Sequence, residues 1–217
     1  MFFSCVVQEK AIKLLCAAAM VAAACTTPCL RAQAAPASPA PAHAAPAGNI
    51  QKLDEVIRQI LAKDGMYSRT TWTANNTYKS VNERKFSVSE ANGCRLIVVS
   101  DVHTHTEFPA QNRVTDHDWS DIFRPDFAHL DVSRITVADP EPRQPQWEAK
   151  GYLVRIPVVL GDPQIVASNV DKQTNKAQDL PRVPALTVYV SSREAADRLA
   201  KAFGELATAC KANPGGF

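Results

Sequence analysis

The stretch RKFSVSEANGCRLIVVSDVHTHTEF, residues 84–108, alternates apolar and polar side chains on both sides of a short turn. A period of two is typical of a β-hairpin with one buried face. A three-residue loop at 91–93 would place Val88 opposite Leu96. This register gathers the apolar side chains on one face: Phe86, Val88, Cys94, Leu96, Val98, Val102 and Phe108.

The other face of this hairpin is polar. It carries Arg95, Asp101, His103, His105 and Glu107. A two-residue Asn-Gly turn would shift the pairing by one residue and bury four of these titratable groups, which is unfavourable without partners. We therefore favour the longer loop and expect both imidazoles to lie in water.

Helical periodicity marks both ends of the remaining sequence. Residues 50–61 form one apolar stripe, with Asn49 as the expected N-cap and Gly65 as the stop. Near the C-terminus, Ser191 and Glu194 have the spacing of a capping box. The following stripe is Ala195, Leu199, Ala202, Phe203, Leu206 and Cys210. We expect a long helix at 192–212.

Further strands are expected between the hairpin and this helix, at 133–138, 151–160, 163–168 and 185–190. Pro157 predicts that its strand is an edge strand or is bulged, and residues 169–184 are expected to form a polar connection. The order predicts an α+β fold that is mainly β. It would be a small antiparallel curved sheet or barrel, capped by the C-terminal helix and preceded by an N-terminal one.

The first 34 residues are typical of an export signal. Two lysines precede a short apolar run, and Ala32 and Ala34 suit cleavage after Ala34. Residues 35–48 are expected to be an Ala/Pro-rich linker, and 49–213 a single globular domain. The alternative is lipoprotein processing, with a lipid anchor at Cys25. Either way we expect an exported protein, periplasmic or secreted.

Charge gives little indication of a partner. Removing residues 1–34 changes the 24 basic and 22 acidic side chains to 21 of each. A net charge near zero does not favour nucleic acid or an anionic membrane surface. We expect no nucleic-acid partner, no transmembrane helix in the mature chain, and an unknown protein or envelope ligand.

Cysteine usage agrees with export. Of the six cysteines, only Cys94 and Cys210 remain after cleavage at Ala34. An even pair in an oxidising compartment predicts one disulfide. Two buried free thiols are the alternative.

Three segments resemble a family of exported bacterial proteins of unassigned role that contain a pleckstrin-homology-like domain. They are GCRLIV at 93–98, HLDVSRITV at 129–137 and LTVYVSSREAADRLAKAFGELATAC at 186–210. The resemblance implies a small barrel closed by the C-terminal helix and a cysteine pair at Cys94 and Cys210. It implies no activity and no ligand residues.

A metal site is the main catalytic alternative. Alternate residues of a strand share one face, so Asp101, His103 and His105 could approach one ion, joined by Asp116, His117 or Asp118 if that segment folds back. The fragment DVHTHTEF, residues 101–108, is similar to the first metal motif of polymerase-and-histidinol-phosphatase phosphoesterases. That family needs further histidines and an α/β barrel, which this sequence does not indicate. We favour a solvated strand face.

No pattern of another enzyme class is evident, and we expect no catalytic residue and no cofactor. The aromatic side chains Trp72, Trp119, Trp147 and Tyr189 are expected to be exposed. Trp119 and Trp147 could border a binding groove or cover the open end of the barrel. The sequence thus favours a non-enzymatic, exported binding or envelope-associated module. The alternative is a metal-dependent hydrolase.

Overall fold

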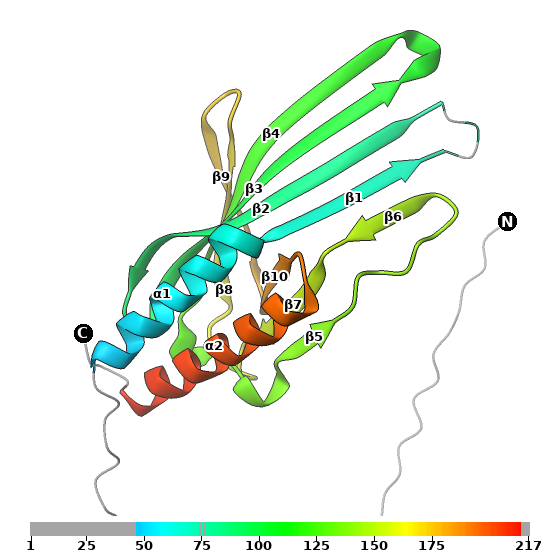
Figure 1. Ribbon diagram of the computed structural model, residues 1–217. Coiled ribbons are helices and arrows are strands. Elements are labelled where there is room, and N and C mark those ends of the chain that lie inside the picture. The colour runs from blue at the N-terminus through cyan, green and yellow to red at the C-terminus, as the bar shows by residue number, and fades with distance from the viewer. Residues whose placement is uncertain (1–46, 74, 76, 214–217) are drawn as a thin grey trace, which may run out of the picture. The chain divides into compact units, whose positions relative to one another are not determined.

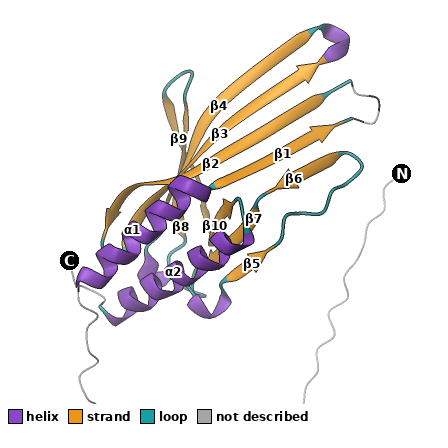
Figure 2. Ribbon diagram, viewed as in Figure 1, coloured by secondary structure: helices purple, strands orange, loops and turns teal. Residues whose placement is uncertain are grey.

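The computed structural model describes residues 47–73, 75 and 77–213, which belong to one compact unit. In Figure 2 the two long helices lie side by side at one end of the molecule, and the longest strands extend beyond them. The elements are α1 (Ala47–Asp64), β1 (Met66–Trp72), β2 (Lys79–Asn92), β3 (Arg95–Phe108), η1 (Pro109–Gln111), β4 (Arg113–Arg124), η2 (Phe127–His129), η3 (Val132–Arg134), β5 (Thr136–Ala138), β6 (Trp147–Lys150), β7 (Tyr152–Pro157), β8 (Ile165–Asp171), β9 (Lys176–Val183), β10 (Ala185–Val190) and α2 (Arg193–Ala212).

Two antiparallel sheets form the β part of the molecule. The first has seven strands in the order β6-β1-β2-β3-β4-β8-β9, and the second has three in the order β10-β7-β5. The mainly β, α+β class with a C-terminal helix is therefore confirmed. Of the two expected forms, curved sheet or barrel, the structure has the open sheet, with β6 and β9 as its edge strands.

The two helices lie side by side and run in opposite directions across one end of the large sheet (Figure 1). Their apolar stripes meet the alternating side chains of both sheets. The largest buried members are Phe127, Phe203, Ile50, Ile57, Leu61, Leu96, Leu130, Ile156, Leu186, Leu199, Leu206 and Val98. The expected α2 stripe, Cys210 included, is fully part of this core.

The β2–β3 hairpin buries the expected face but not in the expected register. Asn92 pairs with Arg95 across a two-residue turn that begins at Gly93, with φ of 59°. The pairing shifts between Val88 and Glu90, so Val88 lies opposite Val98 rather than Leu96. A bulge restores the alternation after the shorter turn. The observed pairing of β2 with β3 differs from the predicted pairing by two residues. Because side chains alternate with a period of two, every side chain remains on the predicted face.

Both helix starts differ from the prediction. The N-cap of α2 is Ser192, whose hydroxyl accepts a hydrogen bond from Ala195 N, whereas Ser191 donates to Asp64 at 3.0 Å. Ser191 thus ties the start of α2 to the end of α1. Helix α1 begins at Ala47, two residues before the expected cap Asn49.

Gly65 ends α1 because a side chain has no room there. A Cβ would lie 2.5 Å from the carbonyl oxygen of Leu61 and 2.6 Å from that of Phe86. The peptide of Gly65 bonds to both residues, since its N–H donates to Leu61 O and its carbonyl accepts from Phe86 N. The chain therefore passes from the helix through Gly65 into β1, and Gly65 is held against β2 by the hydrogen bond from Phe86.

Several details of the later strands were wrongly predicted. Leu160 is 95% exposed, and Pro157 is the last residue of β7, the central strand of its sheet. Residues 113–124 and 176–183 form strands β4 and β9, although their sequences are mostly polar. Both strands are largely exposed, so they lack the apolar alternation that reveals a strand.

In the part of the chain that the structure describes, no helix has the length and apolar character needed to cross a membrane. The predicted signal segment 1–34, the candidate anchor Cys25 and linker residues 35–46 lie outside the described residues. Ala47 and Gly48, which were assigned to the linker, belong to α1.

A buried carboxyl on α1 makes stability depend on pH. Asp54 is 7% exposed, and burial raises its pKa from 3.8 to about 6, although nearby Arg58 acts to lower it. The folded protein therefore binds this proton more tightly than the unfolded chain. The stabilisation is complete below pH 4 and is lost as pH rises through 6.

We expect Asp54→Asn to remove this loss. Relative to the variant, the wild type should lose about 1–3 kcal/mol of unfolding free energy between pH 4 and pH 7.5. Urea denaturation of both proteins at the two pH values measures the difference. Glu55→Gln, at an exposed neighbouring position, is the control. An identical pH dependence for wild type and Asp54→Asn would contradict the assignment.

Candidate functional site

The outer face of the large sheet, turned away from the core, carries the polar side chains of the β2–β3 hairpin. Odd-numbered residues of β3 from Ile97 to Glu107 point to this side, since the even-numbered ones enter the core. The hairpin of β3 and β4 extends well beyond the two helices (Figure 1). We call residues 101–120 of this hairpin the arm.

Strand β4 brings acidic side chains to both histidines of the arm. His103 pairs with Asp118 and His105 pairs with Asp116. His103 Nδ1 lies 2.8 Å from Asp118 Oδ1, and His105 Nδ1 lies 2.7 Å from Asp116 Oδ1. Asp116 also approaches His103, with 3.8 Å between its Oδ1 and Nε2. Asp116 is therefore shared by the two imidazoles.

Two other predicted candidates lie apart from this cluster. Asp101 is held by Lys172 at 2.7 Å and accepts a hydrogen bond from Ser120. Burial acts to raise the pKa of Asp101, but these two partners hold it below its usual value. His117 lies on the opposite face of the sheet, where its ring is 5.1 Å from that of Trp119.

The electrostatics of the cluster favour a charged imidazole. The hydrogen bond to Asp116 raises the pKa of His105 above 6.5, and Glu107 adds to this effect. Glu107 Oε1 lies 3.4 Å from His105 Nε2. His103, His105 and Asp116 each offer a ligand atom, and these atoms lie within 4.8 Å of one another. The group can bind protons or a cation.

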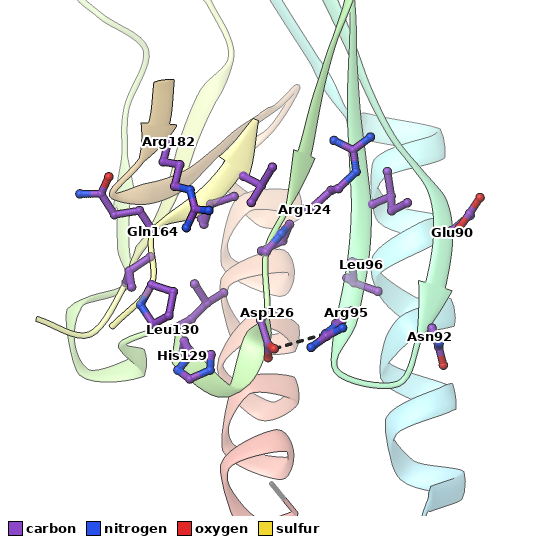
Figure 3. Close-up of a pocket in the computed structure, with 16 residues that line it drawn as sticks. Glu90, Asn92, Arg95, Leu96, Arg124, Asp126, His129, Leu130, Gln164 and Arg182 are labelled. Atoms are coloured by element: carbon purple, nitrogen blue, oxygen red, sulfur yellow. Dashed lines mark hydrogen bonds and ion pairs between the residues drawn. The ribbon is translucent and has the colours of Figure 1, made fainter. Parts of the chain in front are cut away.

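The second candidate site is a cavity of about 500 Å³ at the other end of the outer face. In Figure 3, Arg182 and Gln164 lie on one side, Arg95 and Leu96 on the other, and Arg124 between them. The lining residues are Glu90, Asn92, Arg95, Leu96, Ile97, Arg124, Pro125, Asp126, His129, Leu130, Val158, Pro163, Gln164, Ile165, Val166 and Arg182. They come from five strands and the segments that join them.

Positive charge surrounds this cavity unevenly. Arg95 forms an ion pair with Asp126 at 3.4 Å, drawn in Figure 3, and Arg124 donates to Ser168 Oγ at 2.9 Å. Among the described residues, Arg182 has no hydrogen-bond or ion-pair partner. Glu90 points away from the other labelled side chains. One guanidinium therefore remains available at the rim.

The floor of the cavity is apolar. Leu96, Leu130, Val158 and Ile165 form its base but are at most 8% exposed, so the apolar side chains within reach of a ligand are Ile97, Pro163 and Val166. His129 closes one side, with its Nδ1 at 3.1 Å from Asp162. A cavity with an apolar floor and a few polar groups at its rim is the usual form of a small-molecule binding site.

The disulfide lies next to this cavity, because Cys94 stands between the lining residues Asn92 and Arg95. Cys94, in the turn between β2 and β3, is bonded to Cys210 near the end of α2, with the two Cα atoms 5.6 Å apart. The carbonyl of Cys94 also accepts a hydrogen bond from Phe127 N. These links hold the hairpin end, η2 and α2 together at the cavity.

The aromatic side chains that were considered as the border of a groove lie outside this cavity. The rings of Trp147 and Trp72 contact Arg69 and Arg143, at 4.6 and 5.8 Å from the guanidinium carbons. Tyr189 packs on Tyr67, with ring centroids 4.4 Å apart. None of these rings lines the cavity, and neither does Trp119.

No family model, curated protein or solved structure matches this chain. The site must therefore be interpreted from its own geometry. Sequence reasoning identified the histidine pair but not the cavity. The residues that could have indicated the cavity are Arg95, Arg124 and Arg182, each close to a short apolar segment. They lie far apart in the sequence, and only the fold brings them to one site.

Proposed function

We propose that this protein is a non-enzymatic binding module whose cavity holds an anionic amphiphile. Such a ligand has one carboxylate or phosphate group and an alkyl chain. The observation that carries the proposal is the combination of an unpaired arginine, Arg182, with an apolar floor in a cavity of about 500 Å³.

The size and lining support an alkyl chain. Small-molecule sites commonly enclose about 300–1,000 Å³. Burying a methylene group contributes about 0.8 kcal/mol, so an alkyl chain gains affinity against the accessible apolar side chains of the lining, Ile97, Pro163 and Val166.

The charges support an anionic head group. Arg182 has no ion-pair partner among the described residues and Arg124 donates to the neutral hydroxyl of Ser168, whereas Arg95 is paired with Asp126. A guanidinium binds carboxylate or phosphate through two parallel hydrogen bonds. Such charge-assisted bonds contribute about 1.5–3 kcal/mol.

Export is part of the same proposal. A disulfide that closes a loop of 116 residues persists in oxidising compartments, which fits a periplasmic or secreted protein. A ligand of the envelope, with a charged head and an alkyl chain, would be available there.

Calorimetric titration with decanoate, decyl phosphate and decylamine tests the proposal. We expect the full chain to bind the two anions in preference to the amine. Arg182→Gln should weaken decanoate binding about 10-fold or more, because one charge-assisted hydrogen-bond partner is lost. The relative affinity for decanoate and decyl phosphate separates the two head groups.

Arg198→Gln is the matched control. Arg198 is an exposed arginine on α2 and does not line the cavity, so its replacement should leave the affinity unchanged. Equal affinity of the wild type for decanoate and decylamine would contradict the proposal. So would equal effects of the two arginine substitutions.

A further inference from the structure

We infer that His103, His105 and Asp116 form a binding site for a divalent transition-metal ion, with Asp118 as the group that orients His103. This site lies on the arm and does not depend on the cavity. Ile97 lines the cavity, and His103 is six residues further along β3, about 20 Å away at the rise of an extended strand.

Strand pairing builds the ligand set. His103 and His105 occupy alternate positions of β3, so their imidazoles share one face, and Asp116 faces them from β4. One atom of each lies within 4.8 Å of the others. Bonds of about 2.0–2.2 Å from nitrogen and oxygen to zinc place ligand atoms about 3.3–3.5 Å apart, so small side-chain rotations suffice.

Asp118 prepares His103 for this role. Its carboxylate lies 2.8 Å from Nδ1, which places the proton of a neutral imidazole on that nitrogen. The lone pair is then on Nε2, the atom that faces Asp116 at 3.8 Å. A carboxylate that holds the remote nitrogen of a ligand histidine is the common arrangement at zinc sites.

The donor atoms select the class of metal. Two imidazole nitrogens and one carboxylate oxygen suit Zn²⁺, Cu²⁺ or Ni²⁺, whereas Ca²⁺ and Mg²⁺ prefer oxygen ligands alone. The three protein ligands leave at least one coordination position for water or for a donor from a partner. The side chains are 36–52% exposed, so an ion can reach them directly from solvent.

Calorimetric titration of the full chain with Zn²⁺ tests this site, after free thiols have been blocked with iodoacetamide. Blocking is needed because the four N-terminal cysteines are themselves zinc ligands when they are reduced. We expect one zinc ion per chain. The double substitution His103→Ala and His105→Ala should abolish its binding, and Asp118→Asn should weaken it about 10-fold or more.

His117→Ala is the matched control, since this histidine lies on β4 but on the opposite face. It should retain binding. Addition of Cu²⁺ should broaden the imidazole NMR signals of His103 and His105 but not that of His129, and excess Ca²⁺ or Mg²⁺ should not displace Zn²⁺. Three results would overturn the inference: absence of a one-to-one zinc complex, unchanged binding in the double variant, or an equal loss in His117→Ala.

Discussion

Replacing both Cys94 and Cys210 by alanine is expected to lower the free energy of unfolding by about 3–5 kcal/mol. The bond joins residues 116 positions apart, and its loss releases a long loop in the unfolded chain. Cys210 is also fully buried, so the substitution leaves unfilled space beside α2. Urea denaturation of wild type and variant measures this difference.

Reduction of the wild type gives an independent measurement. Dithiothreitol should shift its urea midpoint towards that of the double variant and should leave the variant unchanged. A wild-type midpoint that does not respond to reduction would show that the disulfide does not hold the hairpin to α2.

Phe203→Ala should produce a loss of similar size, about 3–5 kcal/mol, because it leaves a large cavity in the core. Phe203 is fully buried on α2, and its ring centroid lies 5.5 Å from that of Phe127 in η2. The substitution removes the contact between the C-terminal helix and the segment that borders the cavity. Thermal or urea unfolding monitored by circular dichroism provides the measurement.

Lys201→Ala is the control on the same helix. Lys201 is exposed, and its ion pair with Glu205 at 3.9 Å contributes at most about 0.5 kcal/mol. If the two substitutions had equal effects, α2 would not pack on the sheet and η2 as described.

Local patterns predicted the buried parts of this fold well. The stripe from Ala195 to Cys210 gave the correct face of α2, and alternation gave the correct faces of β3. The hairpin register was wrong because the pattern repeats every two residues. It therefore cannot distinguish Leu96 from Val98 as the partner of Val88.

The exposed strands could not be recognised in the same way. Strand β4 carries polar side chains on both faces where it extends beyond the helices, so no apolar alternation marks it. Its position determines the proposed metal site, because Asp116 and Asp118 reach the histidines only through pairing with β3. Sequence reasoning named the acidic residues at 116 and 118 only as further ligands if their segment folded back, because no pattern marked that segment as a strand paired with β3.

The cavity could not be predicted from the sequence for a different reason. Its walls are built by residues as distant in sequence as Glu90 and Arg182, and its floor consists of ordinary core side chains. No local motif can mark such a site.

Charge reversal at Arg182 tests the central claim most directly. The wild type should bind decanoate more tightly than decylamine, and Arg182→Glu should invert this preference while the affinity for decanol stays the same. The floor would then still accept the alkyl chain, and only the head-group selection would change. An unaltered ratio of decanoate to decylamine affinity in Arg182→Glu would contradict the assignment of this cavity to an anionic ligand.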